Sequence, residues 1–172
     1  MTARIEAFPK PVIAAVGGLA YGGGCEIVEA AHLAVASDRA VFAKPEIKLG
    51  MPPTFGGTQR LARLAGRKRA LELLLTGDPF GAERALELGL INRVVPHAQL
   101  MDAARALARA AIRHSPLALA AILTATTRGL NLPIGEGLLV ESEQFAKIVP
   151  SDDIREGLDA WIEGREPVFA GR

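Results

Sequence analysis

Two glutamates and a run of glycines are the residues of this chain best suited to do chemistry. Glu26 lies just after Gly22–Gly24, and Glu46 follows twenty positions later. Successive glycines let a ligand lie directly against backbone N–H groups. If a helix begins there, its first N–H groups lack internal partners and favour negative charge. A cradle for negative charge beside two acid/base groups favours chemistry on a carbonyl compound.

Each of these features also has a plain structural explanation. The glycines could equally form only a tight turn from a strand into a helix. Glu26 could be a first-turn glutamate stabilised by the helix dipole. Glu46, which follows Pro45, could be an ordinary loop carboxylate. The pairing of the two carboxylates around the glycine turn is what favours the functional interpretation.

The sequence argues against several other kinds of site. Ile27 stands where a dinucleotide-binding fingerprint needs its third glycine, and no Gly-Lys-Ser/Thr of a phosphate loop follows. No signature links Cys25 to a histidine base, so we predict a buried structural thiol. There is no serine nucleophile elbow, which disfavours that class of hydrolase. The histidines and carboxylates show no metal-ligand spacing, so no metal is predicted.

The elements predicted around these residues alternate between strand and helix. A short apolar run at 12–16 predicts a buried strand, and a helix is expected over 24–31. Two more strands are expected at 32–37 and 40–43, followed by a loop of prolines and glycines over 50–57. Strand, helix and strand in succession indicate a layered α/β arrangement.

The rest of the chain, from Thr58 onward, is predicted to be mostly helical. The expected helices cover about 58–65, 68–75, 82–88, 98–114, 116–128, 134–148 and 152–162, with one short strand over 91–96. The arginines Arg60, Arg63 and Arg67 recur at helical spacing and predict a solvated helix face. The change of composition near Ala98 divides the chain into a core, residues 1–97, and a helical region, residues 98–172.

Composition excludes several classes of partner. The 172 residues suit one domain with a real core, and a net charge of +1 gives no general attraction to nucleic acid or membrane. Aromatic residues, at 5%, are too few for a stacking platform along nucleic acid. The longest apolar stretch, 11–20, is too short to span a bilayer. With a single cysteine and no apolar leader at the N-terminus, we expect a soluble cytoplasmic protein.

A series of motifs runs through most of the chain in a fixed order. They are Lys10–Val16 leading to Gly22–Glu26, then Pro45–Gly50, Gly56–Leu61, Leu75–Gly77, Ala82–Ala85, Gly89–Val95, and the tail from Asp153–Gly157 through Gly164–Pro167. In this order they resemble the enoyl-CoA hydratase/isomerase (crotonase) family. No single motif is specific for this family, but the order of all of them along the chain is.

The resemblance implies a fold and a site. The fold would be α/β of the ClpP/crotonase type: a spiral of strand-strand-helix units, with a helical C-terminal region that builds trimers. Glu26 and Glu46 match the two catalytic glutamates of the family, and Gly23 would give one backbone N–H to a thioester oxygen. The residues that the resemblance places against the substrate are Gly22, Gly23, Pro45 and Gly50.

The resemblance also implies a reaction. The expected substrate is an acyl-CoA thioester and the expected reaction is reversible addition of water to a trans-2-enoyl-CoA, with no cofactor apart from the coenzyme A of the substrate. The presence of both glutamates favours a hydratase over an isomerase. The expected assembly is a homotrimer or a dimer of trimers, with no nucleic-acid or membrane partner. The alternatives are an isomerase, a catalytically impaired acyl-CoA-binding or oligomerising remnant, and a hydrolase of the same fold.

The chain departs from the family pattern in three places. Gly17-Gly18 replaces an asparagine-glycine pair, and His32 stands where the family often has aspartate; both are expected to be structural variations. The family's N-terminal segment, which would supply the first strands, part of the coenzyme A pocket and the other oxyanion N–H, has no counterpart here. Because one such donor contributes about 10²–10³-fold in rate, we expect very low or absent activity if this chain is complete.

Overall fold

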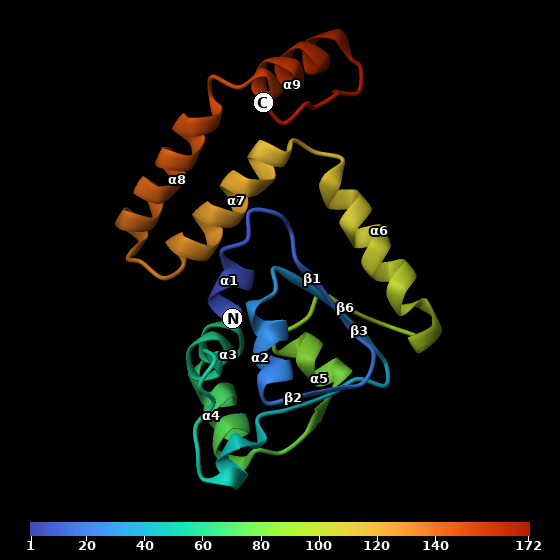
Figure 1. The fold of residues 1–172 in the computed structure, drawn as a ribbon, viewed down its shortest axis with the longest axis vertical. Helices are drawn as coiled ribbons and strands as arrows, with labels where there is room; N and C mark the ends of the chain where they lie inside the picture. The colour runs from blue at the N-terminus through green and yellow to red at the C-terminus, as the bar shows by residue number, and fades with distance from the viewer. The chain divides into compact units, whose positions relative to one another are not determined.

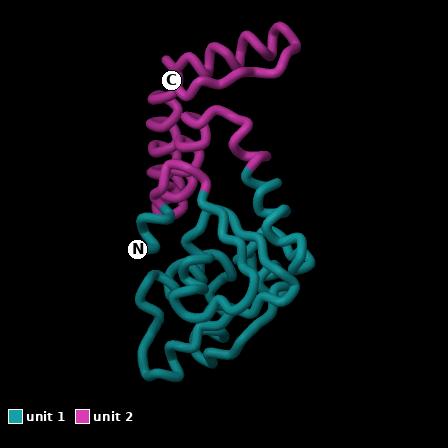
Figure 2. Tube along the Cα trace, turned by 45° about the vertical axis from the view of Figure 1, so that its right-hand side comes forward, with its two compact units in different colours: residues 1–6, 12–108 teal, residues 7–11, 109–172 magenta.

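The computed structural model describes all 172 residues as two compact units (Figure 2). The first unit contains residues 1–6 and 12–108, and the second contains residues 7–11 and 109–172. Helix α6 (Leu100–Ile112) contributes residues to both units. The boundary between these units falls inside α6. The division into a core and a helical region at residue 97, expected from composition, stays a prediction.

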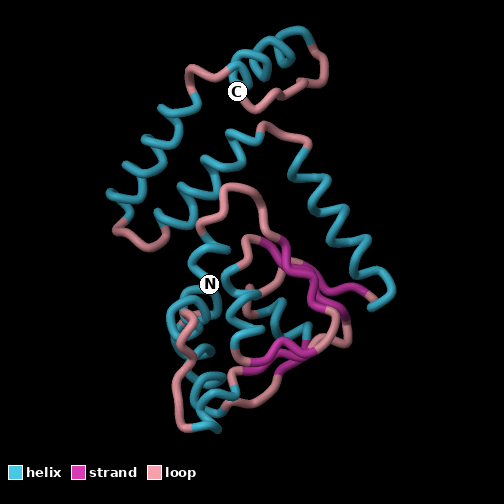
Figure 3. Tube along the Cα trace, viewed as in Figure 1, coloured by secondary structure: helices cyan, strands magenta, loops and turns pink.

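The first unit holds all the strands, together with short helices (Figures 1 and 3). Its elements before α6 are α1 (Thr2–Glu6), β1 (Ile13–Val16), β2 (Leu19–Tyr21), α2 (Gly23–Ala30), β3 (Leu33–Ser37), β4 (Val41–Ala43), the 3₁₀ helix η1 (Pro45–Leu49), α3 (Gly57–Ala65), α4 (Arg67–Thr76), β5 (Phe80–Gly81), α5 (Ala82–Glu87), β6 (Arg93–Val95) and the 3₁₀ helix η2 (His97–Gln99). Each strand and helix predicted from the sequence is present, with its ends within two residues of the prediction.

The strands form two three-stranded sheets, β1-β3-β6 and β2-β4-β5. The first sheet is parallel throughout, with Ala14 opposite Ala34. In the second sheet β2 and β4 are parallel, with Ala20 opposite Phe42, and β5 is antiparallel to β4. From β1 to β4 consecutive strands alternate between the sheets, so the turn after Ser37 crosses from one sheet to the other, whereas β4 and β5 lie in the same sheet. Helix α2 follows the first strand pair and η1 follows the second, which gives a strand-strand-helix repeat.

The elements that the sequence did not predict are all short. They are α1, β2, η1 and β5, of five, three, five and two residues. Strand β2 lies inside the apolar stretch 11–20, where the glycines Gly17 and Gly18 separate it from β1. Elements of this length carry no periodicity, so local pattern cannot distinguish them from loops.

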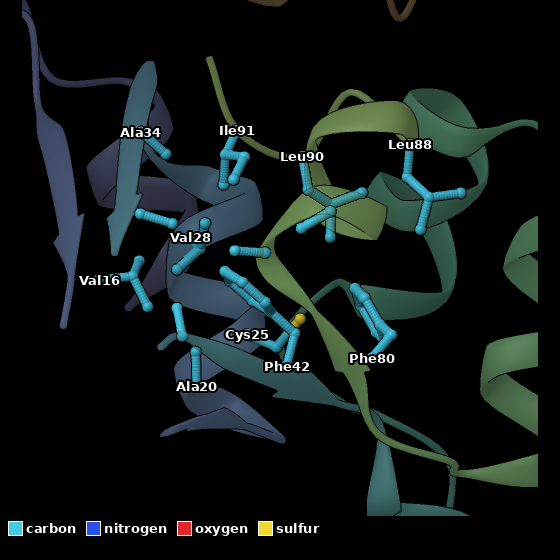
Figure 4. Close-up of a cluster of buried hydrophobic side chains, with 14 of the residues drawn as sticks. Val16, Ala20, Cys25, Val28, Ala34, Phe42, Phe80, Leu88, Leu90 and Ile91 are labelled. Atoms are coloured by element: carbon cyan, nitrogen blue, oxygen red, sulfur yellow. The ribbon is translucent and has the colours of Figure 1, made fainter. Parts of the chain in front are cut away.

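The core of the first unit is built largely from small side chains (Figure 4). Val16, Ala20 and Val28 are among its buried members. The rings of Phe42 and Phe80 stack with their centroids 5.7 Å apart and an interplanar angle of 21°. Helix α2 is buried on most of its surface, and two of its buried residues are glutamates. Buried carboxylates need partners, because desolvation without compensation is costly.

The second unit is helical. It contains α7 (Pro116–Gly129), α8 (Ile134–Ile148) and α9 (Asp152–Glu163), and α7 packs against α8. The backbones of these two helices approach closely where Gly129 faces Gly137: a Cβ added at Gly137 would lie 3.2 Å from the Gly129 carbonyl oxygen. No single helix of the chain meets the criteria for a membrane span; residues 97–112 and 116–129 meet them only when taken as a pair.

His32, one of the departures from the family pattern, has a structural role at the start of β3. Its Nδ1 accepts a hydrogen bond from the Val12 N–H at 2.9 Å. Nε2 therefore carries the ring proton and donates to the Glu6 carbonyl oxygen at 3.1 Å. The ring thus joins three segments of the first unit, which confirms the expectation of a structural variation.

We predict that His32→Ala lowers the free energy of unfolding by about 1–3 kcal/mol, because it leaves the Val12 N–H and the Glu6 carbonyl without their partner. Urea denaturation followed by circular dichroism measures the change. His32→Asn is the matched control: its amide offers both an acceptor and a donor, so it should lose less. A His32→Ala variant as stable as the parent would contradict this role for the imidazole.

Candidate active site

The glycine turn connects β2 to α2 and requires glycine at its first position. Gly22 has φ +53° and ψ −120°, a conformation that L side chains rarely adopt. Its N–H donates to the Ala43 carbonyl and its own carbonyl accepts from the Glu26 N–H, both at 3.0 Å. A Cβ at Gly22 would lie 3.1 Å from Glu46 Oε1. The missing side chain therefore both permits the turn and lets Glu46 reach it.

Gly23 begins α2 and presents a free donor. Its N–H makes no hydrogen bond within the chain, and no side chain caps this helix. The ring of Phe55 lies beside it: a Cβ at Gly23 would be 3.4 Å from Phe55 Cδ2. Phe55 is itself 53% exposed. The start of α2 thus offers an unpartnered N–H next to an accessible apolar surface, at the positive end of the helix dipole.

Glu26 is held rigidly although it lies in the first turn of this helix. The residue is 1% exposed, and its Oε1 accepts hydrogen bonds from the N–H groups of Phe55 at 2.9 Å and Gly57 at 2.8 Å. Bonds to a charged acceptor are stronger than neutral ones and fix the orientation of the carboxylate. A helix-dipole role alone does not account for these two bonds.

The loop that binds Glu26 is itself fastened. The Phe55 carbonyl accepts from Thr2 Oγ1 at 2.6 Å and from Arg60 Nη1 at 2.9 Å. Arg60 Nη2 also pairs with Glu6 Oε2 at 2.7 Å, and its side chain is 15% exposed. The prediction of a solvated face was therefore wrong for Arg60. Helical spacing shows which residues share a face of a helix. It does not show what packs against that face, which here is the N-terminal segment with Glu6.

Glu46 lies on η1, which Pro45 begins and Gly50 ends in a left-handed conformation with φ +73°. One carboxylate oxygen of Glu46 is directed to the glycine turn, as described above. The other, Oε2, is buried and has no hydrogen-bond partner in the chain. Since neither oxygen makes a hydrogen bond within the chain, the carboxylate can act on a water molecule or a ligand. Pro45 and Gly50 set the limits of the turn that carries Glu46, and their contact with a substrate stays a prediction.

Two charged residues that the sequence analysis missed lie behind this site. The side chains of Glu29 and Lys44 are fully buried, with Nζ and Oε1 2.6 Å apart. Burial raises the pKa of Glu29 to about 7, and the charge of Lys44 opposes that rise. The available signal was the spacing of Glu29 three residues after Glu26, which places both on one face of α2.

Cys25 belongs to the same buried group. Its thiol donates to Glu29 Oε1 at 3.6 Å, and its side chain is fully buried. Burial raises the pKa of the Cys25 thiol far above its usual range. A thiol that does not ionise is a poor nucleophile, so the prediction of a structural cysteine is confirmed.

Gly57 keeps open the space that these charges share. A Cβ at this position would lie 2.7 Å from Lys44 Nζ and 2.9 Å from Glu26 Oε1, closer than real contacts allow. The ammonium and the carboxylate therefore both border the volume of the absent side chain. The structure brings Gly22, Gly23, Glu26 and Glu46 together at the start of α2 and on η1; their roles toward a substrate stay a prediction.

The arrangement can polarise a carbonyl group and move protons on the atoms next to it. A free N–H at a helix N-terminus stabilises negative charge that develops on an oxygen. Glu26 is oriented by two backbone donors, and Glu46 has an oxygen without a partner. Two carboxylates beside one oxyanion donor are the groups that general acid/base chemistry needs.

Comparison with known proteins agrees with this arrangement. The sequence model described as "Enoyl-CoA hydratase/isomerase" matches residues 1–172. The short-chain-enoyl-CoA hydratase of Clostridium acetobutylicum is 41% identical over 163 residues, which are 95% of this chain and 62% of that protein. The 2,3-dehydroadipyl-CoA hydratase of Escherichia coli K12 is 40% identical over 170 residues, 99% of this chain and 67% of that protein.

A solved structure shows the same fold. The enoyl-CoA hydratase of Bacillus anthracis superposes with a TM-score of 0.96 at 36% identity, covering 99% of this chain and 66% of that one. This confirms the crotonase fold predicted from the resemblance. The chain spans about two thirds or less of the length of the relatives named here. The chain belongs to the enoyl-CoA hydratase/isomerase family.

Proposed function

We propose that this chain carries the site for reversible addition of water to a trans-2-enoyl-CoA thioester. The observation that carries the proposal is the free N–H of Gly23 beside the carboxylates of Glu26 and Glu46. Membership of the family, and relatives named as enoyl-CoA hydratases, support it.

In this mechanism the thioester oxygen accepts a hydrogen bond from Gly23. The bond withdraws electron density from the conjugated double bond and makes the β-carbon electrophilic. When water adds there, negative charge develops on the thioester oxygen, where the Gly23 donor and the start of α2 stabilise it. The interaction is strongest in the transition state, so it lowers the barrier instead of merely binding substrate.

The two glutamates move the protons. Glu26, held by the Phe55 and Gly57 amides, orients the water and takes its proton as the oxygen bonds to the β-carbon. Glu46 enters the step in its protonated form and delivers that proton to the α-carbon. The proton held by Glu26 then returns to Glu46, so the net change is one water added across the double bond. An isomerase only moves one proton between carbons and needs a single base, so the pair of carboxylates favours hydration.

We further propose that the protein self-associates as a homotrimer or a dimer of trimers. Five large apolar side chains of α8 and α9 are exposed: Leu138, Leu139, Phe145, Leu158 and Trp161. Apolar surface of this kind on α8 and α9 is typical of an interface between subunits.

Glu46→Gln tests the proton-transfer role. We expect hydration to fall by about 10²–10⁴-fold, because an amide cannot exchange the proton. Loss of enoyl-thioester absorbance measures the rate, and circular dichroism shows that the fold is kept. Glu83→Gln, an exposed glutamate on α5, is the matched control and should keep the parental rate. Parental turnover in Glu46→Gln contradicts the assignment. Thioester binding by the parent without turnover would instead favour a non-catalytic acyl-CoA-binding role.

Gly57→Ala tests whether Glu26 must stay where the loop holds it. The added methyl group displaces the carboxylate, and misplacement by about 1 Å can cost about 10²-fold in rate. We expect a loss of that size with little change in secondary structure. Gly135→Ala is the control, because a Cβ there meets nothing within 4 Å. Equal effects of the two substitutions would show that the position of Glu26 is unimportant.

Light scattering on the purified chain tests self-association. At micromolar concentration we expect the mass of a trimer or of two trimers. Trp161→Glu, which places a charge on a side chain 81% exposed, should shift the mass towards the monomer because a buried unpaired charge disfavours association. A monodisperse monomer in the parent would rule out the assembly.

A further inference from the structure

A buried ion pair lies behind the two glutamates of the proposed site and takes no part in the mechanism above. Glu29 lies on α2, one turn after Glu26. Lys44 directly precedes η1, two residues before Glu46. The pair therefore joins the helix that carries one glutamate to the turn that carries the other, with neither partner in contact with solvent.

Stability does not explain this pair well. Removing two charges from water is costly, and apolar residues of similar volume are often as stabilising or more so. The pair is also incompletely satisfied: Glu29 Oε2 has no partner, and Lys44 Nζ makes no well-formed hydrogen bond beyond the close ion contact. A costly, underbonded pair next to a proposed active site suggests a role in that site.

The contacts of Gly57 show what the pair acts on. Lys44 Nζ and Glu26 Oε1 both border the place of the missing Gly57 side chain, 2.7 Å and 2.9 Å from it. In a buried environment the attraction between an ammonium and a carboxylate is weakly screened. Lys44 makes no ion pair with Glu26 itself; its charge acts across the space that Gly57 leaves open, toward the oxygen that the Phe55 and Gly57 amides bind.

We propose that the Glu29–Lys44 ion pair positions Glu26 for catalysis. Glu29 anchors the ammonium of Lys44, and the ammonium holds the Glu26 carboxylate in the orientation that its reaction requires. Both are positioning residues, because neither touches the reacting atoms. The inference rests on the proposed hydratase function, and it adds a requirement for two residues that the family resemblance did not assign.

The competing explanation is that the pair only fills the core. A double substitution distinguishes this explanation from the positioning role. Glu29→Leu with Lys44→Met replaces both charges by apolar side chains of similar size, so the unfolding midpoint should stay near or above that of the parent. If the pair only packs, this variant also keeps the parental kcat. If the pair positions Glu26, stability is kept and kcat is not.

The experiment measures three properties of the parent and of the double variant: the urea unfolding midpoint, kcat and KM with a short enoyl-CoA, and hydrogen exchange of the Phe55 and Gly57 amides. We expect the double variant to lose about 10–100-fold in kcat with little change in KM, as for a misplaced catalytic group. The Phe55 and Gly57 amides should exchange faster, because Glu26, which accepts their hydrogen bonds, is no longer held by Lys44. Parental kcat, or parental exchange rates, would overturn the proposal.

Amide exchange keeps the test independent of activity. A parent that does not hydrate enoyl-CoA refutes the proposed function, and the exchange of Phe55 and Gly57 still decides whether the pair holds Glu26. Glu29→Gln, nearly the same shape, serves if the double variant does not fold: it should lower kcat and speed exchange in the same direction, and parental values would overturn the proposal. Glu143→Gln, which breaks the exposed ion pair with Lys147, is the control and should change neither.

Discussion

A charged helix enclosed in a small core is the constraint that shapes the first unit. Helix α2 buries Glu26 and Glu29 together with its apolar residues, and a buried carboxylate without partners would destabilise the fold. The chain meets this need by bringing the 50–57 loop onto α2 so that two of its amides bind Glu26. Thr2 and Arg60 then fasten the loop from its other side. The same contacts that stabilise the buried charge of Glu26 therefore also fix its position in the proposed site.

Glycine makes each close approach possible. Without a side chain at Gly22, Glu46 reaches the turn before α2, and without one at Gly57, Lys44 and Glu26 can share one small volume. The same turn leaves the Gly23 N–H without an acceptor. The proposed oxyanion donor is thus a consequence of the backbone path, and the glutamates are placed around it by the elements that the glycines allow to meet.

Local pattern in the sequence was enough to predict most elements and the two glutamates around the glycine turn, because periodicity and turn residues act over a few positions. It was not enough to predict the partners. The contacts of Arg60 with Glu6 and of Lys44 with Glu29 join segments far apart in the chain, and helical spacing does not reveal what lies opposite a face. The shortest strands were missed for a related reason: their pairing, rather than their own residues, defines them.

The most direct test of this account is a crystal structure of the chain with a saturated acyl-CoA, which binds as the substrate does but has no double bond to hydrate. The account predicts the thioester oxygen at about 2.7–3.1 Å from the Gly23 nitrogen, with the α- and β-carbons between the carboxylates of Glu26 and Glu46. A thioester bound away from the start of α2, with the Gly23 N–H still without an acceptor, would contradict it.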